Sequence, residues 1–138
     1  VETSLYSQTQ SWNPDHVLIV DQVGILADLY AWGQFSFVGG SMDRSVHSVM
    51  EPLAQGCLTF VGPHHHNNRE ALLFQTVSIH NHPAVQVVTN SQEFIEKLKP
   101  LMGQWGSLQK HDLQREVQKK SGASHIVTKW ISNNTDLH

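Results

Sequence analysis

The chain has a single cysteine, no long apolar run and no surplus of basic residues. Cys57 alone cannot form an intrachain disulfide, so the sequence suits a reducing compartment. No segment approaches the roughly 18 to 20 consecutive apolar residues that cross a bilayer, and no charged stretch leads into an apolar signal sequence, so we expect a soluble chain. Nine Lys and Arg against twelve Asp and Glu give a formal charge of -3, which argues against a nucleic-acid-binding module.

The composition is instead that of one globular domain over residues 1–138. The 138 residues are 39% hydrophobic, and a chain of this size buries roughly two thirds of its unfolded surface when it folds. Histidine is unusually common, with ten in all, and five of them fall within nineteen positions, which raises the question of a metal site. These five are His64, His65, His66, His80 and His82.

Short apolar runs bounded by turn residues predict strands that are buried on both faces, as in a parallel sheet. The first fifteen residues, by contrast, are polar and show no sustained period. The predicted strands cover residues 16–20, 35–38, 57–61 and 84–88.

Segments with helical spacing lie between and after these runs. Pro100 is expected to end or kink the fourth of them, and Gly122 is expected to separate the last two. Ser48, Asn67 or Asn68, and Asn90 or Ser91 are the expected N-caps. The predicted helices cover 25–30, 49–55, 67–75, 91–102 and 112–120, followed by one that carries Ile126, Val127, Trp130 and Ile131.

Strands that alternate with helices predict an α/β domain, a Rossmann-like and mostly parallel sheet flanked by helices on both faces. In such a sheet, ligands bind at the carboxyl ends of the strands. The loops there are 20–24, 38–41 and 61–64, so we expect any binding site to be built from these three segments.

The second of these loops has the features of a phosphate site. Gly39 and Gly40 let backbone N–H groups approach a ligand, and the helix that follows offers unpaired N–H groups with partial positive charge. Glu51, followed by Pro52 in the first helical turn, is suited to accept hydrogen bonds from two sugar hydroxyls. The alternative interpretation is a plain turn in which Glu51 only stabilises the helix start.

The histidine cluster does not have the pattern of a metal centre. Zinc needs three or four converging ligands, but consecutive residues of an extended loop point in alternating directions. His80 and His82 would have to fold back to complete a set with His64 to His66. The sequence also lacks HExxH and CxxC motifs, so we predict no metal and interpret these histidines as a polar loop.

Two other reactive or bulky side chains have unremarkable interpretations. Cys57 lies in a predicted buried strand, where a thiol is inert packing rather than a nucleophile. No GxSxG elbow supports a hydrolase triad. Trp105, between Gly103 and Gly106, is interpreted as a cover for a sheet edge or a contact for a further domain.

The stretch from Val17 to about Glu70 resembles the carboxyl-terminal, donor-binding half of the lipopolysaccharide Kdo transferases, which are two-domain GT-B glycosyltransferases acting on 3-deoxy-D-manno-octulosonic acid. The order and spacing of several short motifs carry the resemblance. They are Val20-Asp21-Gln22-Val23-Gly24, the Leu26 to Tyr30 helix, Phe37-Val38-Gly39-Gly40-Ser41, His47 with Glu51-Pro52, Ala54 and Gly56, and Gly62-Pro63-His64 with Asn67 and Glu70.

The resemblance implies transfer of Kdo from CMP-Kdo to a lipid A precursor at the cytoplasmic face of the bacterial inner membrane, without a metal or other cofactor. It places the donor contacts on two segments, the Val23-Gly24-Ile25 turn and the loop that leads into the helix at Glu51. The implied CMP-Kdo-binding residues are Val23, Gly24, Ile25, Gly40, Ser41, His47, Ser48, Val49, Met50 and Glu51.

The resemblance also implies that this chain is a fragment without a catalytic residue. In the family the catalytic base is a Glu of the amino-terminal domain, and an upstream basic motif also contacts the donor. We therefore expect a nucleotide-holding domain that is inactive alone, with membrane contact made only by the full-length enzyme.

Departures from the family pattern leave alternatives open. Ile25 stands where the family has Glu, Arg44-Ser45-Val46 replaces two glycines in a loop one residue shorter, and Ser48 replaces an Asn. Serine cannot reproduce the paired donor and acceptor of an amide. The alternatives are a degenerate, non-catalytic interaction domain of the same fold and a metal-binding module formed by His64 to His82.

Overall fold

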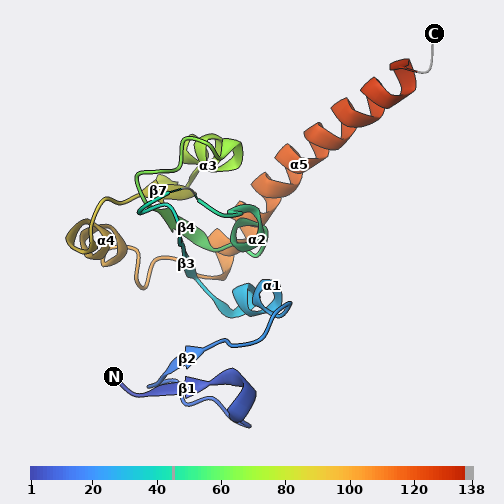
Figure 1. The fold of residues 1–138 in the computed structure, drawn as a ribbon. Coiled ribbons are helices and arrows are strands. Elements are labelled where there is room, and N and C mark those ends of the chain that lie inside the picture. Colours follow the sequence, from blue (N-terminus) through green and yellow to red (C-terminus); the bar gives the residue numbers. More distant parts are fainter. Residues whose placement is uncertain (45, 136–138) are drawn as a thin grey trace.

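A parallel sheet of three strands lies at the centre of the computed structural model, which describes residues 1–44 and 46–135 and gives residues 123–135 by their backbone alone (Figure 1). Every residue of the middle strand is buried, because this strand is paired on both edges and covered on both faces. Three of the four predicted strands form this sheet, and the fourth, predicted at 16–20, is present as a strand outside it. In spatial order the three strands of the sheet are β3 (Phe35–Val38), β4 (Leu58–Val61) and β7 (Val85–Val87).

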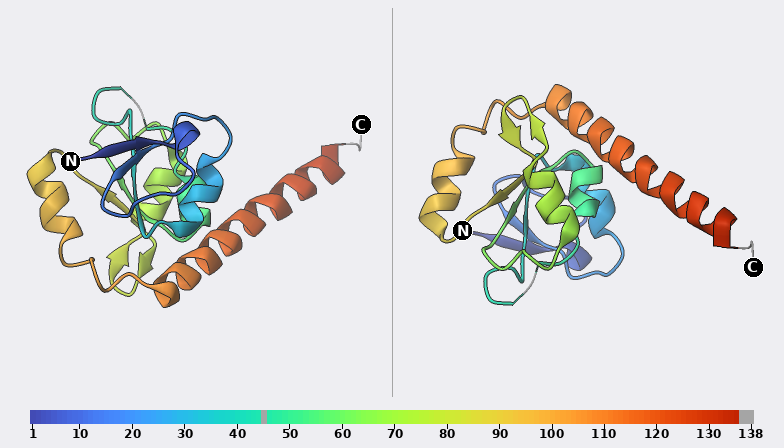
Figure 2. Two further views of the ribbon diagram at one scale, coloured as in Figure 1. Left: turned by 90° about the horizontal axis from the view of Figure 1, so that it is seen from below. Right: turned by 90° about the horizontal axis from the view of Figure 1, so that it is seen from above.

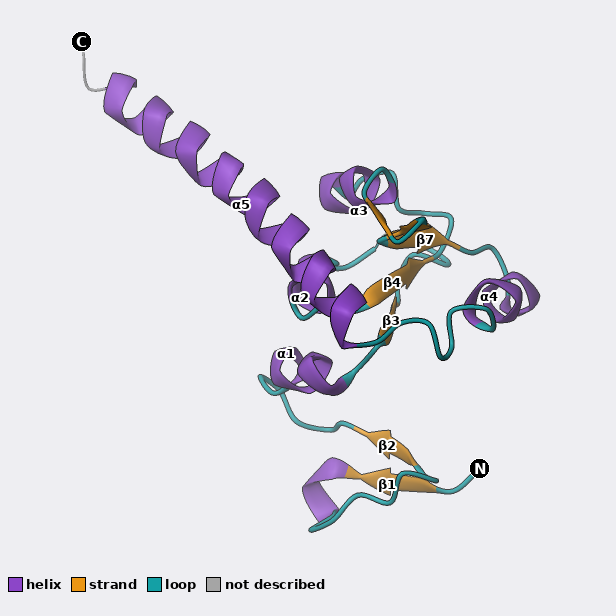
Figure 3. Ribbon diagram, turned by 180° about the vertical axis from the view of Figure 1, so that it is seen from behind, coloured by secondary structure: helices purple, strands orange, loops and turns teal. Residues whose placement is uncertain are grey.

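Helices cover both faces of this sheet (Figure 3). Helix α2 (Met50–Ala54) connects β3 to β4, α3 (Arg69–Gln75) connects β4 to β7, and α4 (Ser91–Leu98) follows β7. The ring of Phe94 in α4 packs edge-on against Phe60 of β4, with centroids 5.0 Å apart, and α4 lies across the sheet from α2 (Figure 3). The predicted α/β class, a mostly parallel sheet with helices on both faces, is confirmed.

Two of the helices begin and end as their sequences predict. The side chain of Asn68 accepts a hydrogen bond from Ala71 N at 2.8 Å to start α3, and Asn90 accepts one from Glu93 N at 2.9 Å to start α4. Helix α4 ends at Leu98, two residues before Pro100.

The last helix, α5 (Ser107–Thr135), is continuous through Gly122, so the prediction of two separate helices is wrong. Glycine inside a helix costs about 1 kcal/mol relative to alanine, which a long helix tolerates. Gly122 is also not among the glycines with positive φ that would signal a helix end. Figure 2 shows the second half of α5 extending beyond the sheet. The predicted apolar side chains Ile126, Val127, Trp130 and Ile131 lie outside the side chains that the structure describes.

The first half of α5 is held against the domain by a buried tryptophan and a close backbone contact. Trp105 is 2% exposed, and its indole Nε1 donates a hydrogen bond to the Gly56 carbonyl at 3.0 Å. Leu113 and Val117 of α5 are also buried. Trp105 therefore packs inside this domain, and its side chain is not left exposed as a contact for another domain.

The amino-terminal segment forms a separate pair of strands, β1 (Thr3–Leu5) and β2 (Val17–Ile19), which run parallel. It includes a 3-10 helix (Tyr6–Gln8), and α1 (Leu26–Leu29) with a 3-10 helix (Tyr30–Trp32) leads on to β3. The predicted burial of 16–20 on both faces is wrong, because Val17 is 50% and Ile19 46% exposed. In the described residues this pair is not hydrogen-bonded to the central sheet.

A short antiparallel hairpin, β5 (Ser78–Ile79) and β6 (His82–Pro83), precedes β7 and was not expected from the sequence. Its two-residue turn has positive φ at both His80 (49°) and Asn81 (70°), as the tightest hairpins require. Asn tolerates this conformation, but a His in the first turn position gives no recognisable hairpin signal.

The close contact at Gly56 leads to a prediction about stability. Gly56 has φ +79°, and a Cβ there would lie 2.7 Å from Lys110 O; Gly103 has φ +87°, but no described atom lies within 4 Å of its Cβ position. Gly103→Ala pays only for the left-handed backbone, about 1–2 kcal/mol of unfolding free energy. We expect Gly56→Ala to cost at least about 1–3 kcal/mol more, because the backbone of α5 must move. Urea unfolding of both variants checks this, and equal losses would contradict the packing of α5 on Gly56.

Candidate functional site

The loop after β3 forms a tight turn at the carboxyl edge of the sheet. Gly40 has φ +84°, a conformation that residues with a side chain rarely adopt. Its carbonyl accepts hydrogen bonds from Arg44 N at 2.9 Å and Asp43 N at 3.3 Å. The two-glycine turn predicted at the end of this strand is therefore present.

Ser41 joins this loop to the loop that follows β4. Its side chain is fully buried; Oγ donates to Val38 O at 3.0 Å and accepts from Gly62 N at 2.6 Å. The Ser41 carbonyl accepts from His64 N at 2.9 Å. A Cβ at Gly62 would lie 2.6 Å from Ser41 O, so only glycine allows the loops to approach this closely.

A second bridge joins the same two loops further out. The amide Nδ2 of Asn68 donates to the carbonyl oxygen of His47 at 3.1 Å. His47 belongs to the segment that leads into α2, and Asn68 starts α3. The structure thus brings the predicted second and third loops together at one edge of the sheet.

The start of α2 differs from the prediction. The N-cap residue is Val49 rather than Ser48, and no side chain caps this helix. Ser48, His47 and Glu51 are exposed, whereas Val49 is completely buried and Met50 is half-buried. Of the predicted donor-binding residues in this segment, Val49 can offer a ligand only its backbone.

The Val23-Gly24-Ile25 turn is more loosely connected to this edge. Val23 is fully exposed, Gly24 has φ +91°, and no described atom lies within 4 Å of a Cβ position at Gly24. The turn leads through α1 to Tyr30, whose pKa is raised by burial first and by the negative charge of Glu51 second. The 3-10 helix that begins at Tyr30 contacts α2, so the segment that follows α1 lies beside this part of the site.

Cys57 and Lys110 converge on the segment just after Tyr30. The buried Cys57 Sγ donates to Tyr30 O at 3.2 Å, and Lys110 Nζ donates to Ala31 O at 2.9 Å. Burial raises the pKa of the Cys57 thiol, which Lys110 partly offsets. The thiol is therefore protonated at neutral pH and packs in the core, as the sequence predicts for an inert cysteine.

The histidine cluster divides into separate environments. His65 is only 5% exposed, so it is not a solvated part of the polar loop that the sequence predicts. Its Nδ1 lies 3.0 Å from Gly62 O, and the centroid of its ring lies 4.4 Å from that of His66. Because a carbonyl only accepts, Nδ1 carries the proton. Among the side chains described, those of residues 1–44 and 46–122, no three His, Cys, Asp or Glu converge as metal ligands.

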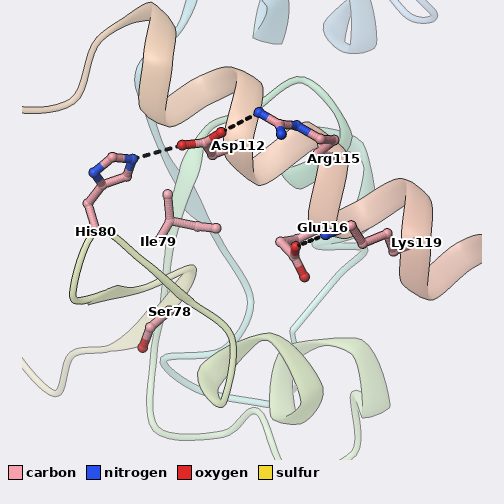
Figure 4. A pocket seen from close by; sticks show the side chains of 7 residues that line it. All are labelled: Ser78, Ile79, His80, Asp112, Arg115, Glu116 and Lys119. Atoms are coloured by element: carbon pink, nitrogen blue, oxygen red, sulfur yellow. Dashed lines mark hydrogen bonds and ion pairs between the residues drawn. The ribbon is translucent and has the colours of Figure 1, made fainter.

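A polar hollow lies between the β5–β6 hairpin and α5, at the amino end of β7 and away from the candidate site (Figure 4). His80 Nε2 and Asp112 Oδ2 are 2.8 Å apart, and Arg115 Nη2 donates to Asp112 Oδ1 at 2.6 Å. Ser78 points away from His80, so Ser78, His80 and Asp112 do not form a catalytic triad (Figure 4). The charged side chains that line the hollow are paired with one another, Asp112 with His80 and Arg115, and Glu116 with Lys119.

This cluster predicts an acid-sensitive contribution to stability. The hydrogen bond from His80, ahead of the charge of Arg115, lowers the pKa of Asp112. A carboxyl group with a lowered pKa stabilises the fold above its ordinary value of about 3.9 and loses that effect as the pH falls below it. Asp112→Asn should therefore lower the melting temperature at pH 7, and this difference should shrink steadily as the pH falls below about 3.9 and through the lowered pKa. Asp43→Asn, at a residue without an ion pair in the described chain, is the control. A pH-independent difference for Asp112→Asn would contradict the prediction.

The Ser41 bridge predicts a second stability effect. Ser41→Ala leaves the buried Gly62 N–H without an acceptor, which should cost about 1–3 kcal/mol of unfolding free energy. Ser48→Ala removes an exposed hydroxyl that caps no helix and should change it by less than about 0.5 kcal/mol. Denaturant unfolding measures both, and a large effect at Ser48 would restore it as the N-cap.

The amino-acid sequence is similar to those of known transferases. No family model matches the chain. It is 31% identical over 116 residues to a 3-deoxy-D-manno-octulosonic acid transferase of Chlamydia trachomatis serovar D, covering 72% of this chain and 26% of the relative. The transferase of Chlamydia muridarum is 32% identical over 80% of this chain and 29% of its own length. That of Aquifex aeolicus is 28% identical over 74% and 28%, respectively.

A solved structure has the same fold. The C-terminal CMP-Kdo binding domain of WaaA from Acinetobacter baumannii superposes with a TM-score of 0.65 at 24% sequence identity, over 86% of this chain and 60% of that one. The chain spans between about a quarter and a third of the length of the curated relatives named above. It is therefore a homologue of the 3-deoxy-D-manno-octulosonic acid transferases, and it shares the fold of a C-terminal CMP-Kdo binding domain.

Proposed function

We propose that this chain is the donor-binding domain of a Kdo transferase and holds CMP-Kdo at the carboxyl edge of β3 and β4. The observation that carries the proposal is the double bridge, through Ser41 and Asn68, that joins the two loops at this edge. The names of the relatives supply the chemistry, since they are transferases of this sugar and the structural neighbour binds its CMP-activated form.

Exposed groups of the bridged loops make the contacts in this proposal. Glu51 is exposed in the first turn of α2, where its carboxylate is free to accept hydrogen bonds from the ribose hydroxyls. His47 and Ser48 precede it with exposed side chains, and Gly40 contributes backbone without a side chain in the way. Arg44 and Arg69, both exposed, offer positive charge to the donor phosphate.

The remaining predicted residues have supporting roles in this scheme. The Ser41 hydroxyl already bonds Val38 and Gly62, so it braces the loops rather than contacting the donor. Val49 offers only its backbone, and Met50 also offers a half-buried side chain. The Val23-Gly24-Ile25 turn, exposed around Gly24, contacts the donor from the α1 side.

We further propose that turnover needs residues beyond this chain. The matched regions cover only 26% and 29% of the relatives' lengths, and the family resemblance assigns the catalytic Glu to an amino-terminal domain. The acceptor would be a lipid A precursor at the cytoplasmic face of the inner membrane, and the domains would meet over the donor. None of the helices in the described residues combines the length and apolar character that crossing a bilayer requires.

Titration with CMP tests the proposal. In ¹H–¹⁵N spectra of the ¹⁵N-labelled chain, CMP should shift the amide signals of Gly24, Gly40 and Ser48 to Glu51. Glu51→Gln should weaken binding by about tenfold or more, because a hydrogen bond to a charged group contributes about 1.5–3 kcal/mol. Glu96→Gln, on α4 across the sheet, is the matched control and should bind as the unmodified chain does. Unshifted signals up to millimolar CMP would refute a working donor site and favour the alternative, an interaction domain that has kept the fold and lost the site.

A further inference from the structure

Asn68 lies where the α3 start and the loop before α2 meet, and its side chain is hydrogen-bonded to both. Its Oδ1 accepts from Ala71 N at 2.8 Å, inside its own helix. Its Nδ2 donates to the carbonyl of His47 at 3.1 Å, twenty-one residues away in the sequence. One side chain therefore caps a helix and connects it to another loop.

The chemistry of the two partners requires an amide at this position. Ala71 offers an N–H, which needs an acceptor, and His47 offers a carbonyl, which needs a donor. A carboxylate caps equally well but has no hydrogen to donate, and a serine hydroxyl caps but is one bond shorter. Asn68 has an extended backbone (φ -105°, ψ 106°), the normal conformation of an N-cap, so the cap is independent of the bridge.

The bridge acts on a segment that has few other directional constraints. Val46 and Val49 are buried and fix the depth of this segment, but apolar contacts do not fix the rotation of a peptide group. No side chain caps α2. Besides the bond from Leu53 N to Val49 O, which belongs to the start of α2 itself, the bond from Asn68 is the one among the described residues that ties residues 46–49 to another element.

We propose that Asn68 is a positioning residue for the donor site, and that its amide fixes the peptide of His47 and hence the orientation of Ser48 and Glu51. This rests on the proposed function for its ligand but not for the ordering of the loop. Asn68 does not contact the donor in this scheme. It acts through the His47 carbonyl, so losing the bridge should affect loop order and donor affinity while leaving the fold in place.

Two serine substitutions separate the bridge from the cap. Asn68→Ser keeps a good N-cap and removes the donor to His47. Asn90→Ser makes the same change at the N-cap of α4. There Oδ1 caps the helix through Glu93 N, while Nδ2 donates to the neighbouring Thr89 and to no other loop, so this variant is the matched control. Melting temperature reports the cap, amide hydrogen exchange at residues 47–50 of the ligand-free chain reports loop order, and CMP titration reports affinity.

We expect both variants to melt close to the unmodified chain. Only Asn68→Ser should speed exchange at residues 47–50, and it should weaken CMP binding about three- to tenfold, as the loss of one ordinary hydrogen bond implies. Unchanged exchange in Asn68→Ser would overturn the proposal, as would CMP affinity equal to that of the unmodified chain. Absence of CMP binding by the unmodified chain would refute the proposed function, and the exchange comparison would still decide whether Asn68 orders the loop.

Discussion

The position of every part of the central domain depends on strand β4, which is buried on both faces and paired on both edges. Its backbone hydrogen bonds leave no freedom in register, with Phe60 opposite Phe37 on one side and Gln86 on the other. Because the three strands are parallel, all their carboxyl ends meet at one edge. The chain leaves β4 there through Gly62, whose missing side chain lets the β3 loop come within contact distance. The site is thus a consequence of sheet register and one close backbone approach.

The parts of the fold that the sequence predicted are those set by local chemistry. A run such as Leu58–Val61 favours a fully buried strand whatever surrounds it, and Asn68 and Asn90 cap helices through bonds within four residues. The errors arise where distant contacts decide. The run 16–20 is apolar enough for a core, yet β2 is paired with a segment of polar residues and left half-exposed. Glycine often follows the last residue of a helix, but the chain continues as helix through Gly122.

The loops that the sequence proposes for the candidate site do meet in the structure, but the contacts within them were not all predictable. Glycines at a strand end identify a turn, and an acidic residue before proline identifies a helix start. Neither pattern shows that the Ser41 hydroxyl is used by two backbone groups or that His65 is buried. These are contacts between residues more than twenty positions apart or within an irregular loop, for which a single sequence has no periodic signal. Asn68 could be recognised as a cap because that hydrogen bond is local, and its second bond was missed because its partner lies twenty-one residues away.

The groups that hold the loops together at this edge are different from the groups that are left exposed. The loops are held together by hydrogen bonds from Ser41 and Asn68 and by the close approach at Gly62. The side chains left exposed are those of His47, Ser48 and Glu51. A ligand that meets loops already ordered loses less free energy to ordering them than one that must fold its own site. The Val23-Gly24 turn follows a strand outside the central sheet and lacks such bracing among the described contacts. A donor bound here would therefore find one wall of its site preformed and would have to order the other.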